Sequence, residues 1–281
     1  MTVAEVRPSP IAGTWYSGDP QRLSRQVDAY LNQAKLPPLE GEVVAVIAPH
    51  AGHRYSGRTA GYAFAAVRGQ SPELAAVLSP YHDFAREPLL TTAHRAYATP
   101  LGTIPVDRDL IAALDERLRR QGKSGLAAIA NDIEHSLEIE LPFLQRALAG
   151  EFRLLPLMVR THDAALLKAV GEILADLLKP LRALLVASTD LSHFYPLPAA
   201  KKLDEHMLRQ FASFSPEGVL KAEEEGSGFA CGAPAVAAVL WAAKALGAGR
   251  VQVLHHSTSA DETGDPSSVV GYGAAAVLKT V

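Results

Sequence analysis

Short apolar runs alternate with amphipathic stretches along most of the chain. Runs rich in aliphatic and β-branched residues predict buried strands at residues 43–49, 75–80, 152–159, 183–189, 251–257 and 269–278. Residues 89–100 predict one or two further strands at a sheet edge. Helical patterns fall between these runs, at residues 20–31, 57–69, 132–148 and 234–246, and another helix opens at Pro216. The pattern therefore predicts an ordered alternation of strands and helices.

Two of the predicted helices carry start signals. Asp19 precedes Pro20, so an N-cap carboxylate is followed by a proline in the first turn, where its missing N–H costs nothing. Asp132 is placed to cap the helix over 132–148, whose leucines fall on one face. Pro142 lies inside that helix and is expected to kink it, because proline removes an interior hydrogen bond.

The chain is expected to form one domain over residues 1–281, because no internal repeat, low-complexity tract or long linker divides it. Strands alternating with helices indicate the α/β class, with a largely parallel or mixed central sheet covered by helices on both faces. In such sheets ligands bind beyond the carboxyl ends of the strands. The strand-to-loop junctions are therefore the places to search for a site.

Composition removes several classes of function. Apolar residues make up 48% of the 281 residues, enough for a sizeable core, and the net charge is only −3 with no basic stripe, which argues against nucleic acid as the ligand. No apolar run is long enough to predict a membrane span, and the first residues lack the apolar core of a secretory signal. A single cysteine excludes an internal disulfide and fits a reducing compartment, so we expect a cytoplasmic protein.

Three histidines fall one to four residues after predicted strand ends. They are His50 in IAPHAG, His82 in LSPYHD and His193 in STDLSHF. A single loop histidine is usually hydrogen-bonded to backbone, but the shared position of all three favours convergence on one site. Imidazole is a preferred ligand of first-row transition metals. The sequence therefore predicts a metal or catalytic site at this edge of the sheet.

Cys231 is the only cysteine, and two interpretations of it stay open. A lone cysteine is most often a small buried hydrophobic residue. Here it lies in GSGFACGAP, a glycine-rich approach to a helix N-terminus, where partial positive charge favours the thiolate that binds metals.

Acidic residues beside two histidines offer acid–base chemistry. Asp190 precedes His193 by three residues and either orients its imidazole or caps the following turn. Glu134 and His135 lie at a predicted helix start and are either a structural cap or an acid and base of the site. No HExxH, CxxC, P-loop, GxGxxG or GxSxG motif is present.

Taken together, these segments resemble the Memo family, named for the mediator of cell motility in animals. The matching segments, in the order of the family, are AGTWY from Ala12, IAPHAG from Ile47, LSPYHDF from Leu78, DIEHSLEIELPFL from Asp132, STDLSHF from Ser188 and ACGAP from Ala230. They span nearly the whole chain. His53 departs from the pattern, because tyrosine is common there in relatives; it adds either a nearby base or a surface group.

The resemblance implies the fold of the class III extradiol dioxygenases, one α/β domain with a non-haem metal pocket. It carries the metal ligands onto His50, His82 and Cys231, and it places Asp190, His193 and His135 in the same pocket as catalytic residues. Ring-cleaving dioxygenases have a glutamate where Cys231 stands. Two histidines with a carboxylate suit iron(II), whereas a softer thiolate shifts the preference toward copper or a more electron-rich iron.

Three functions follow as hypotheses. The first is a dioxygenase-like, metal-dependent oxidoreductase, with iron(II) as the expected metal and copper as the alternative, acting on a small aromatic or heterocyclic compound. The resemblance also implies a radical S-adenosylmethionine enzyme and a small companion protein in the same pathway. The second is a phosphopeptide-binding adaptor, for which Arg54 and Arg58 would supply the basic groups. The third is a protein that binds and stores iron or copper.

Overall fold

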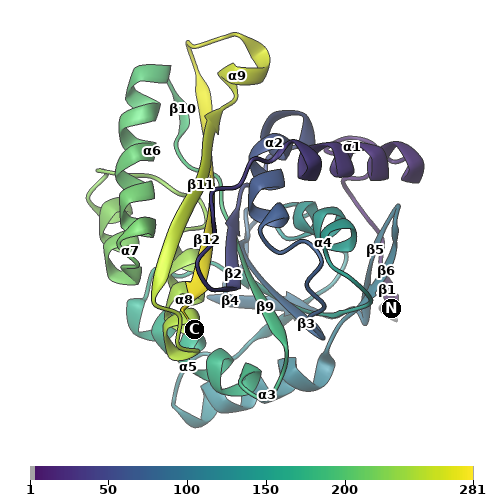
Figure 1. Ribbon diagram of the computed structural model, residues 1–281. Coiled ribbons are helices and arrows are strands. Elements are labelled where there is room, and N and C mark those ends of the chain that lie inside the picture. The colour runs from purple at the N-terminus through teal and green to yellow at the C-terminus, as the bar shows by residue number, and fades with distance from the viewer. Residues whose placement is uncertain (1–3, 281) are drawn as a thin grey trace.

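A mixed sheet forms the centre of the computed structural model, which describes residues 4–280. Within that range the nine-stranded sheet runs in the order β10-β12-β2-β9-β3-β8-β4-β7, and β11 pairs with β12 (Figure 1). A smaller sheet has the order β1-β5-β6. The strands are β1 (Val6–Arg7), β2 (Glu42–Ala48), β3 (Leu74–Pro80), β4 (Leu89–Thr92), β5 (Ala96–Thr99), β6 (Gly102–Pro105), β7 (Ala127–Ile129), β8 (Arg153–Val159), β9 (Ala183–Ser188), β10 (His193–Tyr195), β11 (Arg250–Thr258) and β12 (Val269–Lys279).

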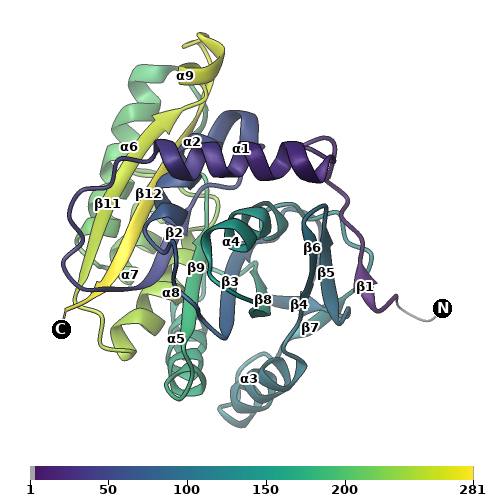
Figure 2. The same cartoon turned by 45° about the vertical axis from the view of Figure 1, so that its right-hand side comes forward.

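Helices cover both faces of this sheet (Figures 1 and 2). One face carries α1, α2 and α4, and the other carries α5 and α8, with α3, α6 and α7 packed beside them. The helices are α1 (Pro20–Gln33), α2 (His53–Ala65), α3 (Arg108–Arg120), the 3₁₀ turn η1 (Glu138–Glu140), α4 (Leu141–Ala147), α5 (Ala164–Leu178), α6 (Leu197–Ala212), α7 (Pro216–Glu224), α8 (Ala233–Ala245) and α9 (Ala260–Thr263). No helix within residues 4–280 has the length and apolar character needed to cross a bilayer.

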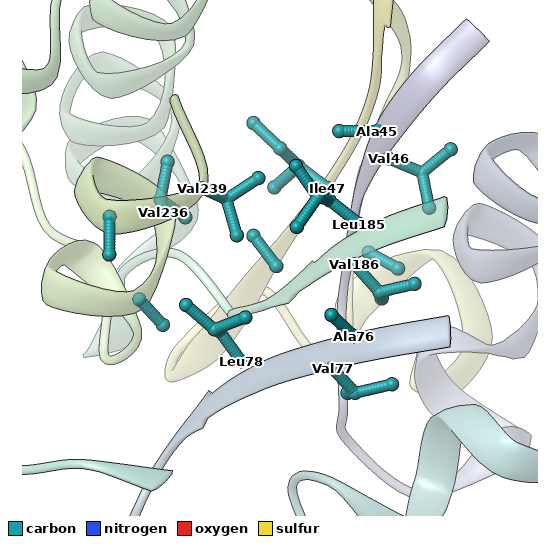
Figure 3. Close-up of a cluster of buried hydrophobic side chains, with 14 of the residues drawn as sticks. Ala45, Val46, Ile47, Ala76, Val77, Leu78, Leu185, Val186, Val236 and Val239 are labelled. Carbon is teal, nitrogen blue, oxygen red and sulfur yellow. The ribbon is translucent and has the colours of Figure 1, made fainter. Parts of the chain in front are cut away.

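The four inner strands β2, β9, β3 and β8 are parallel and buried on both faces, which explains their continuous aliphatic sequences. Pairing places Val46, Val186 and Val77 side by side on one face. Ile47 and Leu78 point to the opposite face, where Val236 and Val239 of α8 meet them (Figure 3). Burying one such side chain contributes roughly 1.5–3 kcal/mol, so this layer fixes the sheet order and with it the positions of the strand ends.

The predicted α/β class, mixed sheet and two-faced helix cover are confirmed, but the predicted helix over 132–148 is wrong. Residues 132–137 are irregular, and regular structure begins only with η1 and α4. Pro142 lies in the first turn of α4 instead of kinking a longer helix. Asp132 caps no helix, because its carboxylate is paired with an arginine near the N-terminus.

That arginine is Arg7 of β1, whose side chain is buried and holds the irregular segment in place. Its guanidinium contacts the Asp132 carboxylate at 2.7 Å and the Glu138 carboxylate at 2.5 Å, and it donates to the Glu134 carbonyl at 2.8 Å. Tyr16 donates its hydroxyl to Glu138 at 2.6 Å. Side-chain charge thus replaces the helical hydrogen bonds that the periodicity of this segment predicts.

We expect Arg7→Met to destabilise the protein by about 3–5 kcal/mol, because it leaves two buried carboxylates without their cation. Urea unfolding of both proteins at neutral pH measures the difference. Arg95→Gln is the control, since that arginine pairs with Glu5 while both side chains are largely exposed, and it should leave stability nearly unchanged. A loss for Arg7→Met as small as that of the control would contradict the anchoring role.

Candidate functional site

Three adjacent strands deliver the predicted residues to one edge of the sheet. His50 follows β2, Asp190 follows β9 and His82 follows β3, and these strands are neighbours in the order β2-β9-β3. Because all three are parallel, their carboxyl ends meet on the same side. The sequence-based expectation about strand ends is therefore confirmed for the placement of these residues.

His135 joins the two strand-end histidines from the irregular segment that Arg7 holds. His50, His82 and His135 each offer a ligand atom, and these atoms lie within 4.8 Å of one another. The rings of His82 and His135 are stacked with centroids 4.7 Å apart, and the His50 ring meets them edge-on at 5.3 and 5.5 Å. Sequence reasoning gave His135 a catalytic role, whereas the structure places it in a histidine cluster with metal-ligand spacing.

Buried hydroxyl and carboxyl groups fix the ring of His50. Its Nδ1 lies 3.0 Å from Ser188 Oγ, and Ser188 Oγ lies 2.6 Å from a carboxyl oxygen of Glu140. When Nδ1 carries the proton, the lone pair of Nε2 points away from Ser188 and Glu140. Burial, with the rings of His135 and His82 nearby, holds the pKa of His50 well below 6.5, so its imidazole is neutral.

The carboxylate of Glu134 hydrogen-bonds the His82 ring and lies beside the His135 ring. Its Oε1 lies 3.0 Å from His82 Nδ1 and 3.3 Å from His135 Nδ1, and its two oxygens also accept the backbone N–H groups of His82, His135 and Ser136. Although burial opposes charge on Glu134, the hydrogen bonds from His82 and Ser136 hold its pKa below the usual range. Burial lowers the pKa of His135 to about 4. By engaging Nδ1 of His82, Glu134 leaves Nε2 of that ring available as a ligand atom.

Cys231 lies against His50, at the start of α8. Its Sγ is 3.2 Å from His50 Nε2 and accepts the Asp190 backbone N–H at 3.3 Å. Gly232 permits this approach, since a Cβ there would overlap the Ser188 carbonyl. Burial and the neighbouring Asp190 carboxylate raise the pKa of the thiol well above 9.0, against the expectation that the helix terminus favours thiolate. A thiolate here requires a bound metal ion.

Asp190 and His193 share the site but do not pair as predicted. Asp190 Oδ1 accepts the backbone N–H groups of His50 at 2.8 Å and Ala51 at 3.3 Å, and Oδ2 lies 4.0 Å from His50 Nε2. His193 Nδ1 instead donates to the Leu191 carbonyl at 2.7 Å, so backbone and not Asp190 orients that imidazole. Burial raises the pKa of Asp190 to about 7, and burial lowers that of His193.

A cavity of about 660 Å³ opens over these groups. Five of the six predicted site residues line it, and Cys231 lies behind His50 without lining it. Sequence reasoning missed most of the remaining wall, which is made by Thr14, Trp15, Ala51, Gly52, Tyr55, Phe194, Ser259, Thr263, Asp265, Ser268, Val270 and Tyr272. Trp15 stacks on His135 with ring centroids 4.0 Å apart, and its only sequence signal was the AGTWY segment.

The donor set fits a transition-metal ion. Three imidazoles whose ligand atoms lie within 4.8 Å of one another suit zinc, iron or copper. The Cys231 thiol lies 3.2 Å from His50 Nε2 but does not belong to this group of three. Hydrogen-bonding partners hold the rings of His50 and His82, which is the usual construction of a metal centre.

His53 is neither of the two alternatives considered from the sequence. It is buried at the start of α2, its Nε2 lies 3.2 Å from the Ile139 carbonyl, and its ring packs on Phe143 and Tyr16. It does not line the cavity. Burial lowers the pKa of His53 from 6.5 to about 4.

The fold and the site together define an α/β domain with a candidate histidine metal centre at the carboxyl edge of its sheet. The family model for Memo-like proteins matches residues 7–276, and the chain belongs to the Memo family.

Related proteins align with this chain over nearly their full lengths. MEMO1 family proteins from Nitrosopumilus maritimus and Aquifex aeolicus are each 32% identical, covering 96% and 95% of this chain and 98% and 97% of their own. One from Methanopyrus kandleri is 31% identical over 95% of this chain and 97% of its own. The crystal structure of an uncharacterized protein from Escherichia coli K12 shares the fold, with a TM-score of 0.54, 15% identity, and coverage of 83% of this chain and 99% of that one.

We expect Glu134→Gln to weaken metal binding by about 10–100-fold, because the uncharged amide cannot keep every hydrogen bond that the carboxylate accepts from His82 and its neighbours, and the tautomer of the His82 ring is released. Competition with a chromophoric chelator measures the affinity for zinc. Asp83→Asn is the matched control: it removes a carboxylate next to His82 that contacts only the Phe84 backbone. Equal affinities for both variants would show that Glu134 does not set the ligand geometry.

We expect His53→Phe to make the protein less sensitive to acid. Below pH 6.5 the unfolded chain binds a proton at His53 that the folded chain refuses until about pH 4, so this group's contribution to stability is full above 6.5 and declines as the pH falls. The variant should lose a slope of up to about 1.4 kcal/mol per pH unit in that window. Urea unfolding at several pH values measures it.

The control for this experiment is a histidine whose pKa is shifted in the opposite direction. The hydrogen bond to Glu223 raises the pKa of the exposed His162, so its contribution is present at low pH and is lost as the pH rises. His162→Phe should therefore not reduce the acid sensitivity. An unchanged slope in His53→Phe would mean that His53 is not the buried neutral group described here.

Proposed function

We propose that this Memo family protein is a dioxygenase-like, metal-dependent oxidoreductase that acts on a small aromatic or heterocyclic compound. The observation that carries the proposal is the cluster of three oriented histidines facing a cavity of about 660 Å³, a volume typical of small-molecule sites. A metal centre that only stabilises a fold is closed by its protein ligands, whereas this one faces open space.

His50 and His82 would hold the metal, with Cys231 as the third ligand and His135 beside them. Iron(II) is the metal we favour and copper the alternative; when bound, iron(II) would supply the one-electron redox chemistry that dioxygen requires. Support for Cys231 comes from the 3.2 Å between its Sγ and His50 Nε2. Support for His135 as a competing ligand comes from its place in the cluster.

His193 and Asp190 are the groups that would move protons. With Nδ1 bound to the Leu191 carbonyl, His193 presents Nε2 to the cavity, and its lowered pKa keeps that nitrogen a free base at neutral pH. Asp190 has a pKa of about 7 and can therefore either give or take a proton near neutrality. The expected partners, a radical S-adenosylmethionine enzyme and a small companion protein, rest on the family resemblance alone.

The cavity gives little support to the adaptor hypothesis. A phosphate group needs cationic side chains, and among the described residues none that lines the cavity is lysine or arginine. Arg54 and Arg58 are exposed on α2 outside the lining, and the Arg54 guanidinium lies over the Tyr55 ring, 5.7 Å from its centroid. Metal storage remains the competing function, and oxygen uptake separates it from catalysis.

We expect the full chain to bind a single divalent ion, and His50→Ala and His82→Ala each to lose it, because both residues are ligands in every arrangement considered. Cys231→Ala and His135→Ala decide the third position. With cobalt(II) as the probe, a thiolate-to-metal absorption band should appear in the parent protein and vanish in Cys231→Ala. A missing band, with metal lost in His135→Ala but retained in Cys231→Ala, would establish a three-histidine centre instead.

Oxygen consumption by the iron(II)-loaded chain with catechols then tests the enzyme. We expect uptake that His193→Gln reduces by about 10²–10⁴-fold while metal content is unchanged, since the variant removes only the proton carrier. Bound iron without uptake on any catechol would favour the storage protein.

A further inference from the structure

The cavity over the histidine cluster has an inner end and an outer end. Asp190 lies 4.0 Å from His50 Nε2 and marks the inner end. The residues at the start of β12 lie beside this end, because the Leu191 backbone bonds to Gly271 and His193 pairs with Val270, and the chain that precedes β12 lies further out. Asp265 lies five residues before Val270 in the loop between β11 and β12, and its side chain is exposed. Figures 1 and 2 show this hairpin, with α9 at its tip, extending past the rest of the sheet.

The wall between the two ends is aromatic. Seven large apolar side chains are exposed in the described structure, and three of them, Trp15, Tyr55 and Phe194, line this one cavity. Phe194 is 74% exposed and has φ of 64°, a backbone conformation that is costly for a bulky residue. A strained, exposed ring at the wall of a cavity indicates a surface kept for a ligand with an aromatic or apolar face.

The outer end carries negative charge and hydroxyl groups. Asp265 Oδ1 accepts the backbone N–H and the hydroxyl of Ser267, at 2.9 and 2.6 Å, while Oδ2 has no hydrogen-bond partner within residues 4–280. Ser259, Thr263 and Ser268 line the cavity beside it. None of the described residues of the lining is lysine or arginine, so nothing there balances this carboxylate.

We propose that the cavity selects aromatic compounds whose side chain ends in a positively charged amine, with Asp265 receiving the amine and Trp15, Tyr55 and Phe194 receiving the ring. The proposal rests on the proposed function only in placing the ring toward the histidine cluster. An ammonium group can donate to a free carboxylate oxygen and to hydroxyl oxygens, and aromatic faces also attract cations. A carboxylate or phosphate at the same position would face Asp265 with no cation to receive it.

Three phenols of nearly equal size test the proposal: tyramine, which is cationic, 4-(2-hydroxyethyl)phenol, which is neutral, and 4-hydroxyphenylacetate, which is anionic. Their Kd values are measured by calorimetry on the full chain, metal-free and zinc-loaded, so that no turnover interferes. We expect tyramine to bind most tightly and the anion most weakly. Asp265→Asn should raise the Kd of tyramine by about two- to fivefold, the range for one exposed ion pair, and leave the neutral phenol unchanged.

Glu262→Gln is the matched control, since it removes one exposed charge from the same hairpin outside the cavity lining and should change no Kd. The proposal is overturned if the anion binds as tightly as tyramine, if no phenol binds, if Asp265→Asn weakens all three equally, or if Glu262→Gln has the same effect. Failure of the proposed function is a separate result. It appears as absent metal binding or absent oxygen uptake, whereas the order of the three Kd values is read on the metal-free chain as well.

Discussion

The ion pairs of Arg7 with Asp132 and Glu138 are the constraint on which the site depends. A guanidinium from the second residue of β1 reaches carboxylates more than 120 positions away, and all three side chains are almost completely buried. Buried charge is costly unless it is paired, so the segment between Asp132 and Glu138 cannot relax into the helix that its sequence favours. Its irregular backbone then presents Glu134 and His135 to the neighbouring strand end.

One carboxylate, that of Glu134, connects this irregular segment to the histidine cluster. Glu134 accepts hydrogen bonds from three backbone N–H groups and from the His82 imidazole, and these bonds fix its position. His50 is held independently, through Ser188 and Glu140 on the far side of the cluster. Burial raises the pKa of Glu140 well above its usual range, whereas hydrogen bonds hold the pKa of Glu134 below it, so the two supporting acids differ in their tendency to ionise.

The sequence predicted the parts of this arrangement that follow from parallel strands ending at one edge of the sheet. Apolar runs located the inner strands, and the rule that parallel strands share a carboxyl edge was enough to bring His50, His82 and Asp190 together. It could not predict the interruption at 132–137, because the leucine periodicity there is helical and the opposing force comes from Arg7, which is distant in the chain. The orientation of His193 could not be predicted either. Its spacing of three residues from Asp190 does not reveal that its ring donates to the Leu191 carbonyl.

The charge of the site depends on which residue completes it, and this connects the ligand question to the shape of the cavity. A divalent ion on three neutral imidazoles keeps two positive charges, whereas a Cys231 thiolate reduces them to one. Because burial and the Asp190 carboxylate raise the pKa of the thiol, a bound metal ion would have to displace the thiol proton for the thiolate to form. The lining supplies no lysine or arginine within the described residues, so a bound ion would be the positive charge that a phenol oxygen meets at the inner end. Asp265 gives the outer end the opposite sign, and a ligand that matches both ends carries its oxygen and its cationic group on opposite sides of a ring.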